Sequence, residues 1–165
     1  MSKTVTIEHG FALPRERVVA AYLEREARLA MMAATGSADP VFERSDAADG
    51  SVDIALRRTV PVDAPAMIQA VVGETTVLEQ REHWQGLAQD SEAVSVDVTS
   101  QPVGQPASAS AEMRIVGVDQ DHCRCVAKLT VKCSVLMVGG MIEAMMIGDS
   151  EAMLRREFAW IEANA

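Results

Sequence analysis

The stretch HCRCVAKLTVKCSV, residues 122–135, alternates between two kinds of side chain. Its small and apolar side chains share one parity: Cys123, Cys125, Ala127, Leu129, Val131, Cys133 and Val135. The residues between them are mostly polar or charged. A period of two places neighbouring side chains on opposite faces of a β-strand, so this stretch predicts a strand with one buried and one wet face. One-sided strands of this kind are typical of antiparallel sheets.

Six other segments alternate in the same way: residues 4–11, 41–44, 51–60, 75–84, 94–99 and 107–115. The segment 41–44 is the shortest and weakest of them, and Asp49-Gly50 after it suits a tight turn. Residues 101–105, with Pro102 and Gly104, are expected to form a loop. The pattern therefore predicts one antiparallel sheet of seven strands.

Three segments break the alternation. Residues 14–34 are rich in alanine and carry apolar residues at steps of three and four, with no strong breaker between Leu23 and Glu26, so the residues alone predict one helix. Residues 141–164 predict a long helix with two neighbouring apolar stripes and a wet side on which Glu151 and Arg155 can pair. Residues 61–73 can form a short helix or a lid.

The dry face of the predicted sheet must be covered by another element, and the last helix is the obvious candidate. A curved sheet wrapped around that helix leaves a space in which a ligand can bind.

The composition limits the class of protein. The chain has 165 residues and a mass of 17.7 kDa, so we expect a single domain over residues 1–165. A hydrophobic share of 48% argues against disorder, and a net charge of −9 argues against nucleic acid or an anionic bilayer as the main partner. No signal peptide or bilayer-spanning stretch is visible, and three cysteines do not suit a disulfide framework. We therefore expect a cytoplasmic protein without stable membrane insertion.

Four sequence motifs carry a resemblance to a known superfamily. The stretch VTIEHGFALPRERV at residues 5–18 is similar to the opening strand and proline-led helix of START-like (SRPBCC, helix-grip) proteins. RRTVPV at 57–62, EHW at 82–84 and VGGMIE at 138–143 resemble an uncharacterised bacterial branch of that superfamily. The resemblance implies an α+β helix-grip fold, in which a curved seven-stranded antiparallel sheet wraps around a long C-terminal helix. It also implies two short helices in a V after the first strand, and it assigns no reaction.

Polar residues at dry strand positions are the most informative candidates for a site. The parity of the strands places His9, Arg58, Gln80 and Glu82 among buried apolar residues. Buried charges are costly unless they are paired, so Arg58 with Glu82 is the favoured ion pair. The alternatives are that these residues lie at wet strand ends, or that they mark a polar spot in a cavity. In the last case Arg58 and His9 could anchor a carboxylate or keto group of a ligand.

Methionine supplies the second signal, with ten Met against 4% aromatic residues. Met side chains often fill gaps in a core, and they also line adaptable pockets for apolar ligands. The predicted ligand pocket comprises His9, Arg58, Gln80, Glu82, Trp84, Met113, Cys125, Met141, Met145 and Met146. The three cysteines share a dry face and lack metal-ligand spacing, so they are interpreted as core residues and no metal site is predicted.

Known catalytic motifs are missing from the sequence. It contains no HExxH, GxSxG or P-loop pattern, so no catalytic residue and no cofactor is predicted. The leading hypothesis is non-catalytic binding of a small hydrophobic molecule, such as a lipid, an isoprenoid or a polyketide-like compound. One alternative is a cyclase or dehydratase that uses His9, Arg58 or Glu82 for acid–base chemistry. Another is a protein-interaction domain with a protein partner on its acidic surface.

Overall fold

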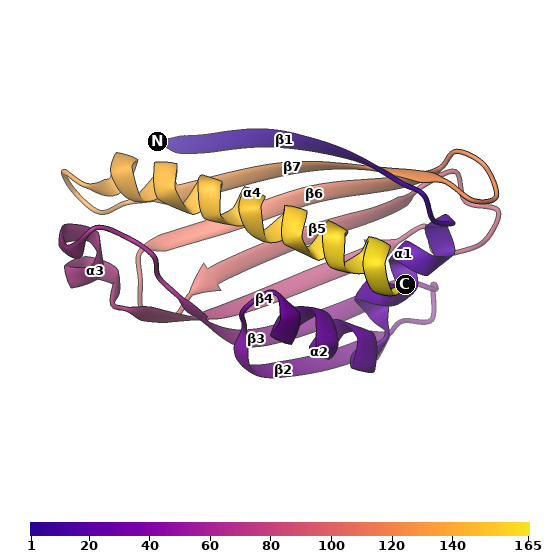
Figure 1. Ribbon diagram of the computed structural model, residues 1–165, viewed down its shortest axis with the longest axis horizontal. Helices are drawn as coiled ribbons and strands as arrows, with labels where there is room; N and C mark the ends of the chain where they lie inside the picture. The colour runs from indigo at the N-terminus through magenta and orange to yellow at the C-terminus, as the bar shows by residue number, and fades with distance from the viewer.

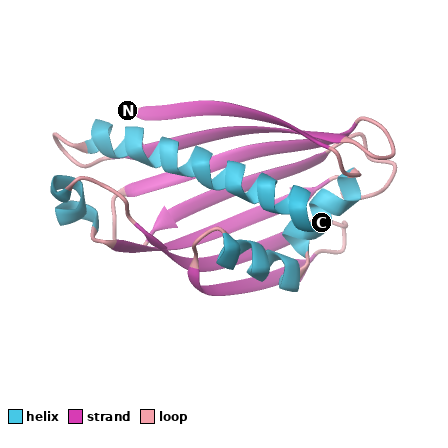
Figure 2. Ribbon diagram, in the orientation of Figure 1, coloured by secondary structure: helices cyan, strands magenta, loops and turns pink.

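The computed structural model describes residues 1–165 and contains one sheet and four helices. Figures 1 and 2 show a curved sheet with α4 and α2 in front of one of its faces. The seven strands all pair antiparallel, in the order β1-β7-β6-β5-β4-β3-β2. They are β1 (Ser2–Phe11), β2 (Ala38–Asp46), β3 (Val52–Pro61), β4 (Thr75–Gln85), β5 (Val94–Pro102), β6 (Ala107–Gly117) and β7 (Cys123–Cys133). The predicted antiparallel helix-grip architecture is confirmed.

The strands depart from the sequence-based expectation mainly at their ends. β2 extends well beyond residues 41–44, because pairing with β3 organises segments that alternate poorly on their own. β5 includes Gln101 and Pro102, which were expected to be loop, and Pro102 still pairs opposite Leu78 of β4. The pairing of β5 with β6 ends at Ser100, so Pro102 has no β6 partner that would need its missing N–H group.

The single helix that the residues alone predict over 14–34 is wrong. The chain forms α1 (Arg15–Leu23) and α2 (Arg25–Ala34), separated at Glu24, whose φ of −80° and ψ of 125° are extended. Arginine side chains satisfy carbonyl groups beside the break: Arg44 of β2 donates to Leu23 O at 3.2 Å, and Arg28 donates to Tyr22 O at 3.4 Å. The two-helix arrangement implied by the resemblance is confirmed.

Helix α4 (Gly139–Asn164) packs mainly on β7 and β1 at one side of the sheet. Its start is fixed to the end of β7, where Glu143 Oε1 accepts a hydrogen bond of 2.9 Å from the Cys133 N–H. Gly139 allows this close approach, because a Cβ atom there would lie 3.1 Å from the Cys133 carbonyl oxygen. The predicted Glu151–Arg155 pair forms on the wet side of α4, at 2.9 Å. None of the helices is long and apolar enough to cross a lipid bilayer.

The core fills the space between the concave sheet face, α1, α2 and the second half of α4. Its largest fully buried side chains include Trp84, Phe11 and Phe158. A second, smaller cluster lies under α3 (Ala66–Val72), where Ile68 packs with Ile142 of α4. Helix α3 therefore covers one end of the space between the sheet and α4 (Figure 1).

Candidate functional site

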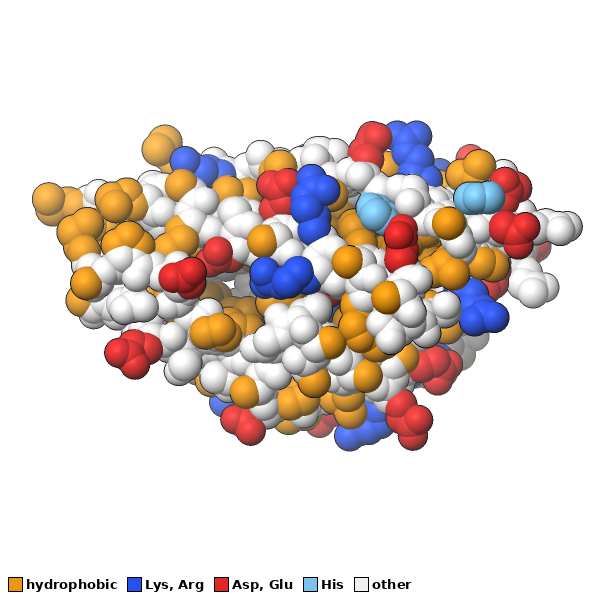
Figure 3. Space-filling view, viewed as in Figure 1, with side chains coloured by type: hydrophobic (Ala, Val, Ile, Leu, Met, Phe, Trp, Pro, Cys, Tyr) orange, Lys and Arg blue, Asp and Glu red, His pale blue; other side chains and the backbone are white.

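A cavity of about 310 Å³ lies between the concave face of the sheet and α4. It exists because α4 packs on β7 and β1, which leaves the inner face of β3, β4 and β5 without a closely packed helix. The loop between β3 and α3 and the C-terminal end of α2 also contribute to its wall. Figure 3 shows the surface hollowed in this region, below α4 and between α3 and α2.

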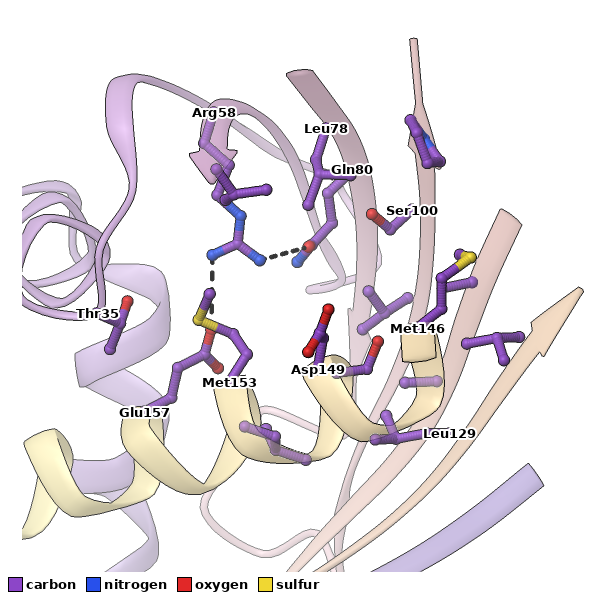
Figure 4. A pocket seen from close by; sticks show the side chains of 18 of the residues that line it. Thr35, Arg58, Leu78, Gln80, Ser100, Leu129, Met146, Asp149, Met153 and Glu157 are labelled. Atoms are coloured by element: carbon purple, nitrogen blue, oxygen red, sulfur yellow. Dashed lines mark hydrogen bonds and ion pairs between the residues drawn. The ribbon is translucent and has the colours of Figure 1, made fainter. Parts of the chain in front are cut away.

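One end of the cavity is apolar. Eighteen of the 35 residues that line it are hydrophobic. Met113 and Leu129 come from the sheet, and Met145, Met146 and Met153 come from α4. Figure 4 shows Met146 and Leu129 on the side of the space away from Arg58. Methionine side chains are flexible and polarizable, so this wall can adapt to apolar surfaces of different shape.

The other end of the cavity contains a buried ion pair between Arg28 of α2 and Glu82 of β4. Arg28 Nη2 lies 2.5 Å from Glu82 Oε1, and the two side chains are 1% and 2% exposed. The Glu82 carboxylate also accepts hydrogen bonds from Gln80 Nε2 at 2.6 Å and from Trp84 Nε1 at 2.9 Å. Arg28 stacks over the Tyr22 ring, 4.9 Å from its centroid. Burial alone would lower the pKa of Arg28. The carboxylate of Glu82, together with Glu157 and Tyr22, has the larger opposite effect, so the pKa of Arg28 is raised from its ordinary value.

Arg58 of β3 lies beside this ion pair but is bonded much less completely. Its Nη2 donates to Gln80 Oε1 at 3.4 Å, and its Nη1 lies 3.8 Å from Glu157 Oε1 of α4, beyond hydrogen-bond range. Glu157 in turn accepts a bond of 3.3 Å from the Tyr22 hydroxyl. The pKa of Arg58 is lowered, mainly because burial disfavours its charge. Figure 4 shows Arg58 and Gln80 extending into the space toward Glu157 and Met153 of α4.

The rim of the cavity carries additional charge. Asp63, Asp149 and Arg156 are among the residues that line it. Burial, followed by repulsion from Asp63, raises the pKa of Asp149, and Arg156 opposes the shift. The rim is therefore a place where a carboxylate has less favourable surroundings than in water.

Seven of the ten residues predicted to form the pocket line this cavity: Arg58, Gln80, Glu82, Trp84, Met113, Met145 and Met146. The other three lie elsewhere. His9 stacks on Phe158 and contacts Glu162 Oε1 at 2.6 Å, Cys125 is buried in the core, and Met141 is half-exposed at the start of α4. The predicted Arg58–Glu82 ion pair does not form, because Glu82 pairs with Arg28 from α2 instead.

Arg28, Tyr22 and Glu157 belong to the polar end of the cavity but are not among the residues predicted for the pocket. Arg28 lies three and four residues before the buried Met31 and Met32, and so shares their face of α2. Glu157 lies on the apolar stripe of α4 that Leu154 and Ile161 define. A charged residue on an apolar helix stripe was the signal that could have found both.

Residues considered for acid–base, thiol or metal chemistry are not assembled into one site. His9 does not line the cavity that holds Arg58 and Glu82. All three cysteines are buried and free, and burial raises the pKa of Cys123 to about 11 and that of Cys125 to about 12. No group of three or more His, Cys, Asp or Glu side chains has an arrangement that could hold a metal ion.

The sheet and the long helix form a helix-grip fold, and the cavity lies between them. The chain belongs to the family described as "Protein of unknown function (DUF2505)", whose model matches residues 6–163. No curated protein sequence matches the chain.

Solved structures with a similar fold share little sequence identity with this chain. A START superfamily protein from Mycobacterium smegmatis is 14% identical, with a TM-score of 0.64 over 98% of this chain and 99% of that one. The Zhui aromatase/cyclase from Streptomyces sp. R1128 is 15% identical, with a TM-score of 0.61 over 98% and 94%. Norcoclaurine synthase from Thalictrum flavum, in complex with dopamine and hydroxybenzaldehyde, is 13% identical, with a TM-score of 0.54 over 100% and 89%. At these identities the likeness shows the fold alone.

Proposed function

We propose that the protein binds a small, largely hydrophobic molecule, such as an isoprenoid, a polyketide-like compound or a small lipid, in the cavity between the sheet and α4. The observation that carries the proposal is the cavity itself, about 310 Å³ in volume with a methionine-rich apolar wall. This volume is at the lower end of the ~300–1,000 Å³ range of ligand pockets, which favours a compact ligand over a phospholipid with two long chains.

Binding without catalysis agrees with the polar groups of the cavity. Both oxygens of Glu82 accept hydrogen bonds from Arg28 and from neighbouring side chains, so this carboxylate is already engaged as an acceptor. His9 pairs with Glu162 away from the cavity. The fold is also that of a protein bound to dopamine and hydroxybenzaldehyde, which supports this space as a site for small molecules.

Two measurements test the proposal. Native mass spectrometry of protein purified from its own host should detect a co-purifying small molecule. The fluorescent probe N-phenyl-1-naphthylamine should bind the purified protein, and Met146→Trp, which fills the apolar wall, should weaken that binding about tenfold, or ~1.4 kcal/mol. Val118→Trp is the matched control, because Val118 is 66% exposed and does not line the cavity.

The proposal is contradicted if the wild-type protein neither carries a ligand from its host nor binds the probe. Equal probe affinity for wild type and a folded Met146→Trp variant would place probe binding outside the cavity, and would also count against it.

A further inference from the structure

We propose that the ligand carries an uncharged oxygen acceptor, a ketone or other carbonyl group, and that Arg58 binds this oxygen. This inference rests on the proposed function, because it assigns the chemical class of the ligand in the same cavity. The end of the ligand that meets Arg58 is then polar but uncharged, and it is not a carboxylate.

The first argument is the unused hydrogen-bonding capacity of Arg58. The residue is only 6% exposed, and its Nε and Nη1 atoms are buried without a hydrogen-bond partner in the protein. A guanidinium has five N–H donors and no acceptor, so only an acceptor atom can satisfy these groups. Buried donors are normally satisfied because leaving them unpaired is costly. Arg58 lines the cavity, but its Nε and Nη1 atoms have almost no exposed surface, so an oxygen at the polar end of a ligand reaches these donors when the guanidinium turns toward the cavity.

Arg28 is a weaker candidate for this role. Both of its terminal nitrogens contact Glu82, at 3.4 and 2.5 Å, and the Tyr22 ring lies against its guanidinium. Only its Nε is without a partner. The donors that remain for a ligand are therefore concentrated on Arg58.

The second argument is the charge of the cavity wall. Its charged residues are three arginines, Arg28, Arg58 and Arg156, and four carboxylates, Asp63, Glu82, Asp149 and Glu157. Near Arg58 the charges balance, because the two cations Arg28 and Arg58 face Glu82 and Glu157. A ligand carboxylate would add uncompensated negative charge to this buried network, which low-dielectric surroundings penalise. A carbonyl oxygen accepts the same hydrogen bonds and adds no net charge.

Three naphthalenes of similar shape separate these possibilities. They are 2-acetylnaphthalene, a ketone; 2-naphthoate, a carboxylate; and 2-ethylnaphthalene, a hydrocarbon. Displacement of N-phenyl-1-naphthylamine gives the affinity of each. We expect wild type to bind the ketone about tenfold more tightly than the hydrocarbon, as for a hydrogen bond to a charged donor. The ketone should also bind more tightly than the carboxylate.

Variants of the network test the role of Arg58 itself. Arg58→Met should remove the preference for ketone over hydrocarbon, whereas Arg57→Met, its neighbour on the outer face of β3, should keep it. Glu157→Gln removes one negative charge, so 2-naphthoate should bind that variant about tenfold more tightly than wild type. If Arg58→Met does not fold, the charge-matched double variant Arg58→Met/Glu157→Gln and the single Glu157→Gln still provide both readouts.

Different failures contradict different claims. If the probe binds but wild type binds the carboxylate as well as the ketone, or Arg58→Met keeps the ketone preference, the assignment of Arg58 is wrong and the hydrophobic cavity remains. If neither the probe nor any of the naphthalenes binds, the proposed function fails together with the inference.

Discussion

Arg28 and Arg58 enter the same polar region from opposite sides, one from α2 and the other from β3, and their surroundings differ sharply. Arg28 contacts Glu82 through both terminal nitrogens, at 3.4 and 2.5 Å, and rests on the Tyr22 ring. Arg58 has one long hydrogen bond of 3.4 Å and a carboxylate at 3.8 Å. The residues are similarly hidden from water, at 1% and 6% exposed.

The difference shows that two buried arginines of one cavity can differ in how many of their donors are used. A buried ion pair whose hydrogen bonds are nearly complete holds α2 against the sheet and offers little to a ligand. A buried arginine with two unpaired donor atoms, Nε and Nη1, retains the capacity to bind one. Burial alone does not distinguish Arg28 from Arg58, whereas the hydrogen bonds that each side chain makes do.

The largest expected effect comes from breaking the complete ion pair. Arg28→Met leaves the Glu82 carboxylate buried without its cationic partner, so the free energy of unfolding should fall by about 3–5 kcal/mol. Urea unfolding followed by circular dichroism measures this change. Arg25→Met is the control on the same helix: Arg25 is exposed and bonds only the Phe42 carbonyl, so its loss should cost less. Equal losses for the two variants would contradict the structural role assigned to Arg28.

A smaller loss of stability is expected at Arg58. Arg58→Met deprives Glu157 of a nearby cation, but it also removes two buried donors that lack partners, so the two effects partly cancel. The free energy of unfolding should fall by about 1–2 kcal/mol. Arg58→Met/Glu157→Gln should recover part of this, because the remaining amide needs no cation. A loss at Arg58 as large as that at Arg28 would remove the distinction between the two arginines.

The smallest effect is expected at the rim, where a charge lies near water. The raised pKa of Asp149 means that the folded protein holds this proton more tightly than the unfolded chain does. Stability therefore decreases as the pH rises from the ordinary pKa of an aspartate through the raised value, and the cost persists at pH 7. Asp149→Asn should stabilise the protein at pH 7 by at most about 0.5 kcal/mol, because Asp149 is exposed and water screens its charge.

The same variant should have no such advantage at pH 3, where Asp149 is largely protonated in both states. Thermal unfolding at the two pH values provides the measurement. Asp97→Asn, on the exposed face of β5, is the control for a general loss of negative charge. A stabilisation by Asp149→Asn that is the same at both pH values would not come from the carboxylate.

The architecture was predictable because nearly every strand has one buried face. In β7 each odd-numbered residue from Cys123 to Cys133 is buried, so the alternation in the sequence reports the sheet directly. The break at Glu24 was not predictable from the residues alone, because glutamate is a good helix former. Arg44 of β2, which donates to the Leu23 carbonyl beside the break, comes close to it only after folding.

The candidate site was predictable only in part, for a related reason. Strand parity correctly places Arg58, Gln80 and Glu82 on the buried face. The alternation along a strand does not predict which arginine forms the ion pair with Glu82, because Arg28 lies on a helix, 54 residues away in the chain. It also cannot separate His9 and Cys125, which face the buried side but not the cavity, from Trp84, which lines it. That distinction depends on where α4 crosses the sheet.

The strand order has a consequence for how the chain is made. The strands from β2 to β7 each pair with the next strand in sequence, so they can assemble as successive hairpins during translation. β1 is the exception, because Ile7 pairs with Ala127, and its partner is synthesised long after it. Contacts between such distant segments form late and slowly. α4 is translated after β7, so the nascent chain exposes the apolar inner face of the sheet until α4 docks. During that interval chaperones have access to a surface that lines the cavity in the folded protein.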